Sequence, residues 1–418
     1  MDRICTSYGH SGTRRPEDLE RNEGISGGKE TLRRNTKKNT ASPPSDYQIK
    51  RAILRGIRKQ GFEIDESKHL VPNSTDKSEV RKRHEEAVNF LISRSQSLIR
   101  RHEDEYIRRF IANGRDLDPL AIDPKLVEVD NDDKSALFRW VKLHWSVPTS
   151  AGYGRRLRYL VLDKQNGKLI GIIGLADPVY GLKDRDAFIG WTKEQRSRRL
   201  RNVMDAFVLG SVPPYSRILG GKLVASLVAS SEISSRFRRK YRGQTSLISG
   251  TVFDGTLAAI TTASALGKSA MYDRIRIAGG LEFIHTGWSS GSGDFQFING
   301  NYEKLRDMAK EVAYTGKNTK WGTGVRSRRC VVRKALGELD LSRNLQYHGI
   351  RRELFVVPLG ENWKEYLCEK TKKFRGYNLP SHRIVDLMME RWVVPRSTRD
   401  VSYMSFESDE YRLAKVSS

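Results

Sequence analysis

Cysteine and long apolar runs are scarce in this chain of 418 residues. Its three cysteines, Cys5, Cys330 and Cys368, are too few and too far apart for a disulfide framework, and no two of them form the Cys-x-x-Cys pair of a zinc site. No run approaches the roughly 18 apolar residues of a membrane span, and the first twenty residues lack the apolar centre of a signal peptide. We therefore expect a cytoplasmic protein with no membrane partner, and the sequence predicts neither a metal site nor a cofactor.

Basic residues, in contrast, are abundant. The chain has 75 Lys and Arg against 50 Asp and Glu, which gives a formal net charge of +25. Phosphates attract clustered Lys and Arg without regard to sequence, so the expected partner is a nucleic acid, with DNA preferred. A solvated basic surface is the alternative interpretation of the same composition.

Composition and periodicity divide the chain into four regions. Residues 1–45 are polar and basic, and they bury too little apolar surface to order themselves, which predicts a disordered basic arm. Residues 46–144 read as a helical region, with one helix over 46–61 and a longer one over 79–113. Residues 301–418 are predicted to be mainly helical, with a short strand at 353–358, and to form a lobe on the central sheet or a second domain.

The region from 145 to 300 carries the strand signals. Two apolar runs, 156–163 and 168–176, flank the turn Asn166-Gly167 and predict a β-hairpin. Further strands are expected at 187–191, 206–212, 245–253, 282–286 and 294–298, and helices over 193–203 and 219–242. Strands with interposed helices indicate an α/β (α+β) fold with a mixed sheet.

The turn from Ser216 to Lys222 resembles the pyrophosphate-binding turn of the acetyltransferase-like (GNAT) fold. That turn has Arg or Gln, two residues, Gly, one residue and then a second small residue, because backbone N–H groups must approach phosphate at a helix end. Arg217 and Gly220 match, whereas Lys222 replaces the second small residue. The resemblance implies a GNAT-like mixed sheet for 145–300, used either for acyl transfer or for another purpose.

A second resemblance covers residues 145–370 and is to the DruA family of the Druantia anti-phage defence system. It rests on 153–161, 169–174, 184–191, 196–203, 261–276, 283–297, 321–326 and 348–355. It implies a defence component that acts with other Druantia proteins, including a helicase-like subunit. Many family members have Glu-Thr-Phe-Val-Asp where this chain has Gly-Thr-Val-Phe-Asp254, so Asp254 matches while an acidic partner is absent.

Basic runs with interleaved aromatics recur at 196–201, 236–242, 326–334 and 370–375, a pattern typical of nucleic-acid binding. The turn Gly267-Lys268-Ser269 could hold an anion through successive N–H groups, although it is not a Walker A loop. The predicted nucleic-acid contacts are Arg155, Arg185, Arg196, Arg199, Arg239, Lys268, Arg274, Arg276, Trp288, Arg326 and Arg352.

Catalytic residues are not assigned by any motif. His348 lies near Glu353 in the sequence, as a general acid or base would, but no partnered nucleophile is evident. Asp254 and Tyr272 are the other candidates. The acidic residues around Arg185 could bind a ligand or merely solvate a loop. The sequence therefore predicts a nucleic-acid-binding subunit of a Druantia-type system; the alternative is an enzyme on nucleic acid, either a GNAT-like base modifier or a metal-dependent nicking activity.

Overall fold

The computed structural model describes residues 45–150, 152–245, 250–277, 279–298, 301–313 and 325–413, with backbone only for 310–313 and 325–328. The chain divides into two units, residues 1–43 and 44–418, and every described residue belongs to the second. The predicted basic arm at 1–45 therefore lies almost entirely outside the described residues. None of the described helices is long and apolar enough to cross a membrane.

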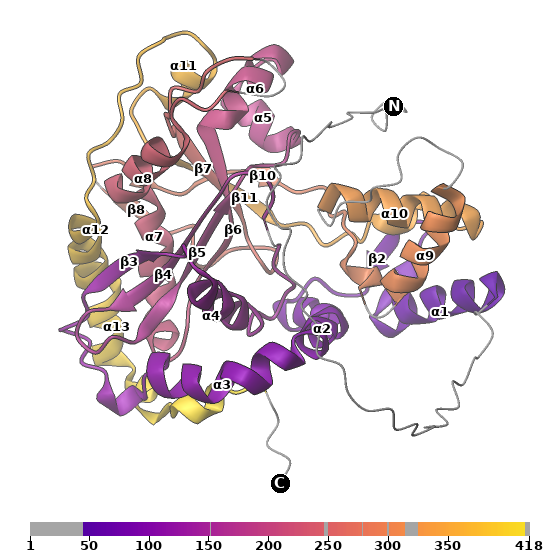
Figure 1. The fold of residues 1–418 in the computed structure, drawn as a ribbon, viewed down its shortest axis with the longest axis horizontal. Helices are drawn as coiled ribbons and strands as arrows, with labels where there is room; N and C mark the ends of the chain where they lie inside the picture. The colour runs from indigo at the N-terminus through magenta and orange to yellow at the C-terminus, as the bar shows by residue number, and fades with distance from the viewer. Residues whose placement is uncertain are drawn as a thin grey trace, which may run out of the picture. The chain divides into compact units, whose positions relative to one another are not determined.

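A seven-stranded mixed sheet forms the centre of the described unit (Figure 1), in the order β10-β11-β7-β6-β5-β4-β3. The strands are β3 (Pro124–Glu128), β4 (Arg156–Asp163), β5 (Leu169–Ala176), β6 (Val203–Ser211), β7 (Ala259–Ala263), β10 (Ile284–Trp288) and β11 (Glu353–Pro358). Only the pairing of β6 with β7 is parallel. The predicted α/β class with a mixed sheet is confirmed, and the sheet takes β3 and β11 from outside the 145–300 region.

Both faces of the sheet are covered by helices, because the side chains of its inner strands are apolar on both sides. Every residue of β5 is buried. One face packs against α7 (Gly220–Ser226), α8 (Ser231–Tyr241) and α12 (Ser381–Met388) through residues such as Leu157, Ile173 and Met204. The other packs against α3 (Gln96–Phe110) and α4 (Asp132–Lys142) through Leu160 and Ile172.

A second apolar cluster, which we call the α1 lobe, is built from segments distant in sequence. It contains α1 (Asp46–Lys59), the hairpin β1 (Phe62–Ile64) with β2 (Leu70–Pro72), α9 (Asn301–Ala313) and α10 (Val325–Glu338). Ile49, Ile53 and Ile57 recur every four residues, and all three are buried. Ser45 and Gln48 form a capping box, which begins α1 where the sequence predicts a helix.

Two predicted strands are wrong, and a third, at 245–253, lies partly outside the described residues. Two predicted helices are each interrupted, and the one expected over 219–242 becomes α7 and α8, separated at the extended Ser230. Residues 187–191 include the end of the helix α5 (Lys183–Ile189) and Gly190, which follows the helix in a left-handed conformation. Residues 294–298 contain the 3-10 turn η5 (Phe295–Phe297), while the described part of 245–253 holds only the bridge Thr245 to Val252. The 79–113 helix is broken at Ser95 into α2 (Lys77–Arg94) and α3, where the Ser95 hydroxyl donates to the Leu91 carbonyl.

Shorter elements connect these parts. They are η1 (Gly114–Asp116), α6 (Lys193–Arg199), η2 (Leu200–Asn202), η3 (Tyr215–Ile218), η4 (Leu227–Ala229), β8 (Arg276–Ile277), β9 (Leu281–Glu282), η6 (Arg343–Gln346), α11 (Trp363–Leu367), the π-helix η7 (Met389–Val393), α13 (Val394–Arg399), η8 (Val401–Ser405) and η9 (Ser408–Tyr411).

Candidate functional site

The two parallel central strands separate after a short stretch of pairing. Residues Val203–Ala206 of β6 pair with Ala259–Thr262 of β7, and the pairing ends there. The next residue, Phe207, is a β-bulge on the opposite side of β6, since Gly174 pairs with Val208 and Leu175 with Ala206. A bulge increases local twist and bends its strand, so β6 turns away from β7 at this point.

A cleft of about 510 Å³ opens where the strands separate. Its volume is in the range of ordinary small-ligand sites. It is lined by Lys77, Arg81, Trp145, Val147, Pro148, Thr149, Ser150, Asp205, Ala206, Phe207, Val208, Leu209, Thr262, Ala263, Ser264, Ala265, Leu266, Lys268, Ser269, Ala270, Met271, Tyr272 and Arg352. We call it the β6–β7 cleft.

One carboxylate lies inside the cleft. Asp205 Oδ1 accepts a hydrogen bond from the hydroxyl of Thr261 at 2.7 Å, and burial raises the pKa of Asp205. Tyr272, one of the predicted catalytic residues, lies in the same cleft and stacks on Phe283 at 5.0 Å. Burial raises the pKa of Tyr272 to about 12, so its hydroxyl stays protonated at neutral pH.

Four cationic side chains surround the opening. Lys77 and Arg81 come from the first turns of α2, Lys268 from the loop after β7, and Arg352 from the residue before β11. Lys77, Arg81 and Lys268 are exposed, and within the described part of the chain none of them makes an ion pair or a side-chain hydrogen bond. We call these three residues the cleft rim.

Two buried histidines lie beside Arg352. The Nδ1 of His84 contacts the Val80 carbonyl at 2.7 Å, and its Nε2 is 3.3 Å from Arg352 Nη2, which fits a neutral ring with its proton on Nδ1. Burial, together with the neighbouring cation Arg352, lowers the pKa of His84 to about 4 and that of His348 to about 3. The backbone N–H of Ile350 donates to His348 Nδ1 at 3.2 Å.

These low pKa values predict a loss of stability in mild acid. The unfolded chain protonates both histidines below about pH 6.5 and the folded chain does not, so the stabilisation is complete above that pH and is lost as pH falls. At pH 5 the loss amounts to about 2 kcal/mol for each histidine. In urea unfolding, His348→Asn, which keeps an acceptor at this position, should shrink the loss between pH 7.5 and 5 by about that amount. The exposed His69→Asn is the matched control; equal pH dependence in all three proteins would contradict the prediction.

Four of the predicted phosphate contacts are engaged inside the protein. Arg155 pairs with Asp177 at 2.7 Å, and Arg185 pairs with Asp186 at 2.6 Å with only 1% of its side chain exposed. Arg196 also binds Asp186, and Arg199 binds Glu369. These four guanidinium groups therefore hold elements of this chain together, and their carboxylate partners compete with any phosphate.

The other predicted contacts are dispersed. Lys268 and Arg352 lie in the cleft, whereas Arg239 on α8 and Arg274 are exposed elsewhere. Arg276 pairs with Glu282 at 3.0 Å. Trp288 is partly buried at the sheet edge, with its backbone N–H donating to Asp184 and the guanidinium of Arg351 over its ring. The Arg326 side chain lies outside the described residues.

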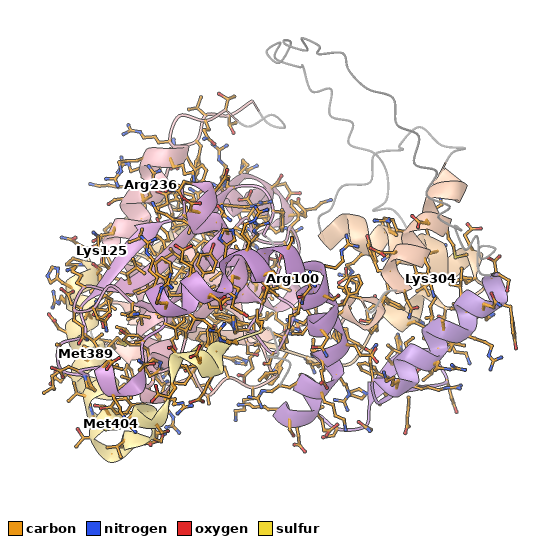
Figure 2. All side chains as sticks on the ribbon, turned by 60° about the horizontal axis from the view of Figure 1, so that its bottom comes forward. Arg100, Lys125, Arg236, Lys304, Met389 and Met404 are labelled. Carbon is orange, nitrogen blue, oxygen red and sulfur yellow. The ribbon has the colours of Figure 1, made fainter. Side chains whose placement is uncertain are left out.

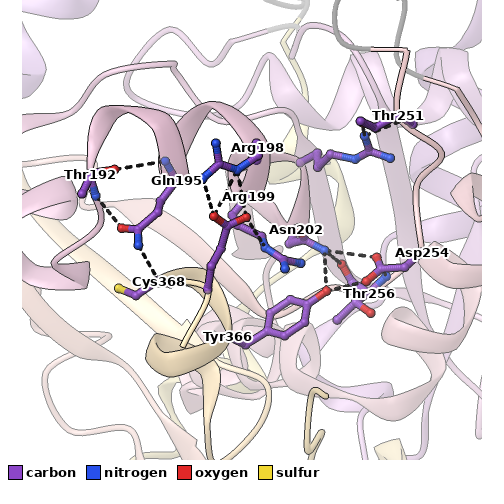
Figure 3. Close-up of polar contacts among 12 residues, drawn as sticks. Thr192, Gln195, Arg198, Arg199, Asn202, Thr251, Asp254, Thr256, Tyr366 and Cys368 are labelled. Atoms are coloured by element: carbon purple, nitrogen blue, oxygen red, sulfur yellow. Dashed lines mark hydrogen bonds and ion pairs between the residues drawn. The ribbon is translucent and has the colours of Figure 1, made fainter. Parts of the chain in front are cut away.

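Asp254 belongs to a polar network that ties the start of β6 to α11 (Figure 3). Its carboxylate accepts hydrogen bonds from the Tyr366 hydroxyl, from Asn202 and from the backbone of Thr256. These bonds lower its pKa even though burial opposes the shift. Nearby, Glu369 binds both Arg198 and Arg199. Within the described residues, no three His, Cys, Asp or Glu side chains are placed to hold a metal ion.

One predicted anion-binding turn is occupied by a carboxylate of the protein itself, and in a second the lysine side chain is engaged inside the protein. The backbone N–H of Ser269, in the Gly267-Lys268-Ser269 turn, donates to the buried carboxylate of Glu353 at 2.6 Å. In the GNAT-like turn, the amine of Lys222 is buried and donates to the Met271 carbonyl at 2.6 Å. Burial lowers the pKa of Lys222 to about 8.

Several residues of the cleft were not among the predicted contacts, namely Lys77, Arg81, Trp145 and Asp205. One signal for Asp205 was present: it is the only charged residue in the otherwise apolar run 203–209, where a side chain on a sheet face needs a polar partner. Lys77 and Arg81 carried no such signal, because only the fold brings α2 beside the loop after β7.

Comparison with known proteins decides the family. A family model described as "Druantia protein DruA" matches residues 74–369. The curated Druantia protein DruA of Escherichia coli (strain UMEA 4076-1) is 36% identical over 361 residues, which cover 86% of this chain and 89% of that protein. The chain belongs to the DruA family. The match therefore places it among the Druantia proteins, and the sequence resemblance to that family already implied a role in anti-phage defence.

The DruA match also frames the cleft. Its first residue, 74, precedes Lys77, and its last, 369, follows Arg352, so every residue that lines the β6–β7 cleft lies inside the DruA stretch. Helix α1 and the residues after 369 lie outside it. No solved structure matches this chain, so the GNAT-like assignment of its sheet stays a prediction.

Proposed function

We propose that this DruA-family chain is a nucleic-acid-binding component of a Druantia anti-phage system, and that it binds through the β6–β7 cleft and its rim. The observation that carries the proposal is the charge of the opening: Lys77, Arg81 and Lys268 are exposed and have no acidic partner among the described residues. Unpaired cations are those most able to displace counterions from a phosphate backbone.

The basic runs in the sequence support this choice of surface by contrast. In the run 236–242, Arg236 and Lys240 both bind Glu128. In the run 196–201, Glu369 and Asp186 accept from three of the arginines. Figure 2 labels Arg236 on α8, on the side of the molecule that also carries Lys125. Five basic residues of these two runs are therefore paired with acidic residues of the chain, whereas the three cations of the cleft rim have no described acidic partner.

Aromatic side chains in the cleft favour an unpaired strand as the ligand. Trp145 and Phe207 are partly buried in its wall, and base stacking on such side chains is worth about 1–3 kcal/mol per base. A duplex keeps its bases stacked on each other, so it offers the cleft only phosphates. We infer a preference for single-stranded DNA, and an action together with the other Druantia proteins, including a helicase-like subunit that would supply such strands.

Removal of the rim charges tests the proposal. The triple variant Lys77→Gln, Arg81→Gln, Lys268→Gln should weaken binding of a labelled single-stranded oligonucleotide and reduce the slope of log K against log salt by about 2, because each lost phosphate contact removes about 0.7. Fluorescence anisotropy between 50 and 300 mM salt gives the slope. The oligonucleotide should remain intact with and without magnesium. Magnesium-dependent cleavage would show that the protein is an enzyme and not only a binding subunit.

The matched control removes the same charge elsewhere. Arg100, Lys125 and Lys304 are exposed, make no described ion pair and lie on three different elements (Figure 2). The triple variant Arg100→Gln, Lys125→Gln, Lys304→Gln should keep most of the slope. Equal losses in the two triple variants would show that only the net charge matters, and the cleft would then not be the binding surface.

A further inference from the structure

Arg352 is partly buried, and its partners differ from those of Arg155, which is also partly buried, and of the buried Arg83 and Arg185. Arg155 and Arg185 each bind a carboxylate, and Arg83 donates to the Ser74 carbonyl at 2.6 Å and to the Asn73 amide oxygen. The described partner of the Arg352 guanidinium is the ring nitrogen of His84 at 3.3 Å, and no described carboxylate pairs with it. Burial is the cause that lowers its pKa.

A cation that is partly removed from water, with no anion beside it, carries a desolvation cost. Removing one partner of a buried ion pair destabilises a protein strongly, because the remaining charge has lost its hydration and has no opposite charge beside it. His84 accepts a hydrogen bond from the guanidinium, but neither it nor His348 supplies a negative charge, since both are neutral at physiological pH. Arg352 lines the β6–β7 cleft, so an anion that enters the cleft can reach the guanidinium.

The rest of the cleft indicates what carries that anion. The cations Lys268 and Arg352 share the cleft with the carboxyl of Asp205, with hydroxyls of Thr262 and Ser269, and with the aromatic ring of Trp145. A nucleotide has matching parts: an anionic phosphate, hydrogen-bond donors on the sugar and base, and a planar base that stacks. A simple anion would use only the first of these.

We propose that the β6–β7 cleft holds a single nucleotide, with its phosphate on the guanidinium of Arg352 and its base and sugar toward Asp205 and Trp145. This deepens the proposed nucleic-acid binding and rests on it for the source of the nucleotide, which is a residue of the bound strand or a free nucleotide. The volume of about 510 Å³ makes the cleft a pocket for one unit of a strand, while the rim contacts its neighbours.

The test is Arg352→Met in the full chain, which removes the charged guanidinium and keeps an unbranched side chain as long as the arginine stem. Calorimetric titration with deoxyadenosine monophosphate should show binding to the unchanged protein and at least a tenfold loss in Arg352→Met, with partial recovery in Arg352→Lys. Deoxyadenosine, which lacks the phosphate, should bind neither protein. Binding of the monophosphate to Arg352→Met at unchanged affinity would overturn the proposal, as would equal affinity of the unchanged protein for inorganic phosphate.

Stability gives a second readout that separates a ligand-binding arginine from a structural one. Without ligand, Arg352→Met should unfold at the same temperature as the unchanged protein or a higher one, because an uncompensated charge has been removed. Arg155→Met, which orphans Asp177, should unfold at a lower temperature. A marked fall in the unfolding temperature of Arg352→Met would identify a structural role and overturn the proposal.

Competition identifies the source of the nucleotide. Displacement of a labelled single-stranded oligonucleotide by deoxyadenosine monophosphate would show that the strand's own nucleotide occupies the cleft, whereas binding without displacement would show a free nucleotide. If the protein bound the monophosphate but no DNA, the proposed function would fail and the cleft assignment would stand. If the protein bound DNA, lost that binding in the rim triple variant and kept its nucleotide affinity in Arg352→Met, only the proposed nucleotide site at Arg352 would fail.

Discussion

Replacing Asp186 by alanine should destabilise the protein by about 3–5 kcal/mol, because it leaves the charge of Arg185 buried and unpaired. The carboxylate of Asp186 accepts from Arg185 at 2.6 Å and from Arg196 at 2.8 Å. It also accepts from the backbone N–H of Leu182 and from the indole of Trp191. One side chain thus organises α5 and its connection to α6.

Urea unfolding followed by circular dichroism measures this effect. The matched control is Glu361→Ala, which breaks an exposed ion pair to Arg375 whose two side chains are 67% and 62% exposed. Such surface pairs contribute about 0–1 kcal/mol, so the control should unfold nearly as the unchanged protein does. An Asp186→Ala variant within 1 kcal/mol of the unchanged protein would show that the carbonyls of Val179 and Tyr180, at 2.9 and 3.2 Å, suffice for Arg185.

Replacing Trp140 by alanine should cost about 3–5 kcal/mol as well, for a different reason: it empties a fully buried site. The indole N–H of Trp140 donates to Glu103 at 3.1 Å, and its ring contacts Tyr106 and Tyr411 at centroid distances of 5.4 and 5.6 Å. Because Tyr411 belongs to η9, the cavity also weakens the attachment of the C-terminal segment to α3 and α4.

Limited proteolysis together with urea unfolding tests this second effect. Cleavage within residues 400–413 should become faster in Trp140→Ala than in the unchanged protein, in addition to the loss of stability. Leu120→Ala, at a residue that is 75% exposed, is the control and should alter neither quantity. Unchanged cleavage in a destabilised Trp140→Ala would mean that the C-terminal segment is held by its other contacts, such as the hydrogen bond from the Leu413 backbone N–H to Glu103.

The local sequence pattern predicts secondary structure correctly where it agrees with the packing. The hairpin of β4 and β5, the strand β11 and the helix α1 were predicted nearly at their observed bounds, because apolar period and turn residues decide them locally. It failed at residues 187–191, where an apolar run that reads as a strand ends the helix α5. There the Asp186 carboxylate accepts hydrogen bonds from Leu182, Trp191 and Arg196, all within ten residues of it, and the apolar run alone does not show these contacts.

The candidate site was much less predictable than the fold. The predicted contacts came from basic runs, yet four of them are bound by carboxylates. Arg155 binds Asp177 and Arg199 binds Glu369, while Arg185 and Arg196 share Asp186. A run of arginines reports the charge of a segment and says nothing about which acid lies opposite. Lys268 and Arg352 are the predicted contacts that the structure brings into one cleft.

The sequence by itself determined the family, the mixed α/β class and the excess of basic charge, because motif order, hydrophobic period and composition are properties of the chain alone. Only the tertiary structure decided which cations are free. An ion pair needs its two charged groups in contact, so Arg185 and Arg352 look alike in the sequence, although only Arg185 has a carboxylate within reach.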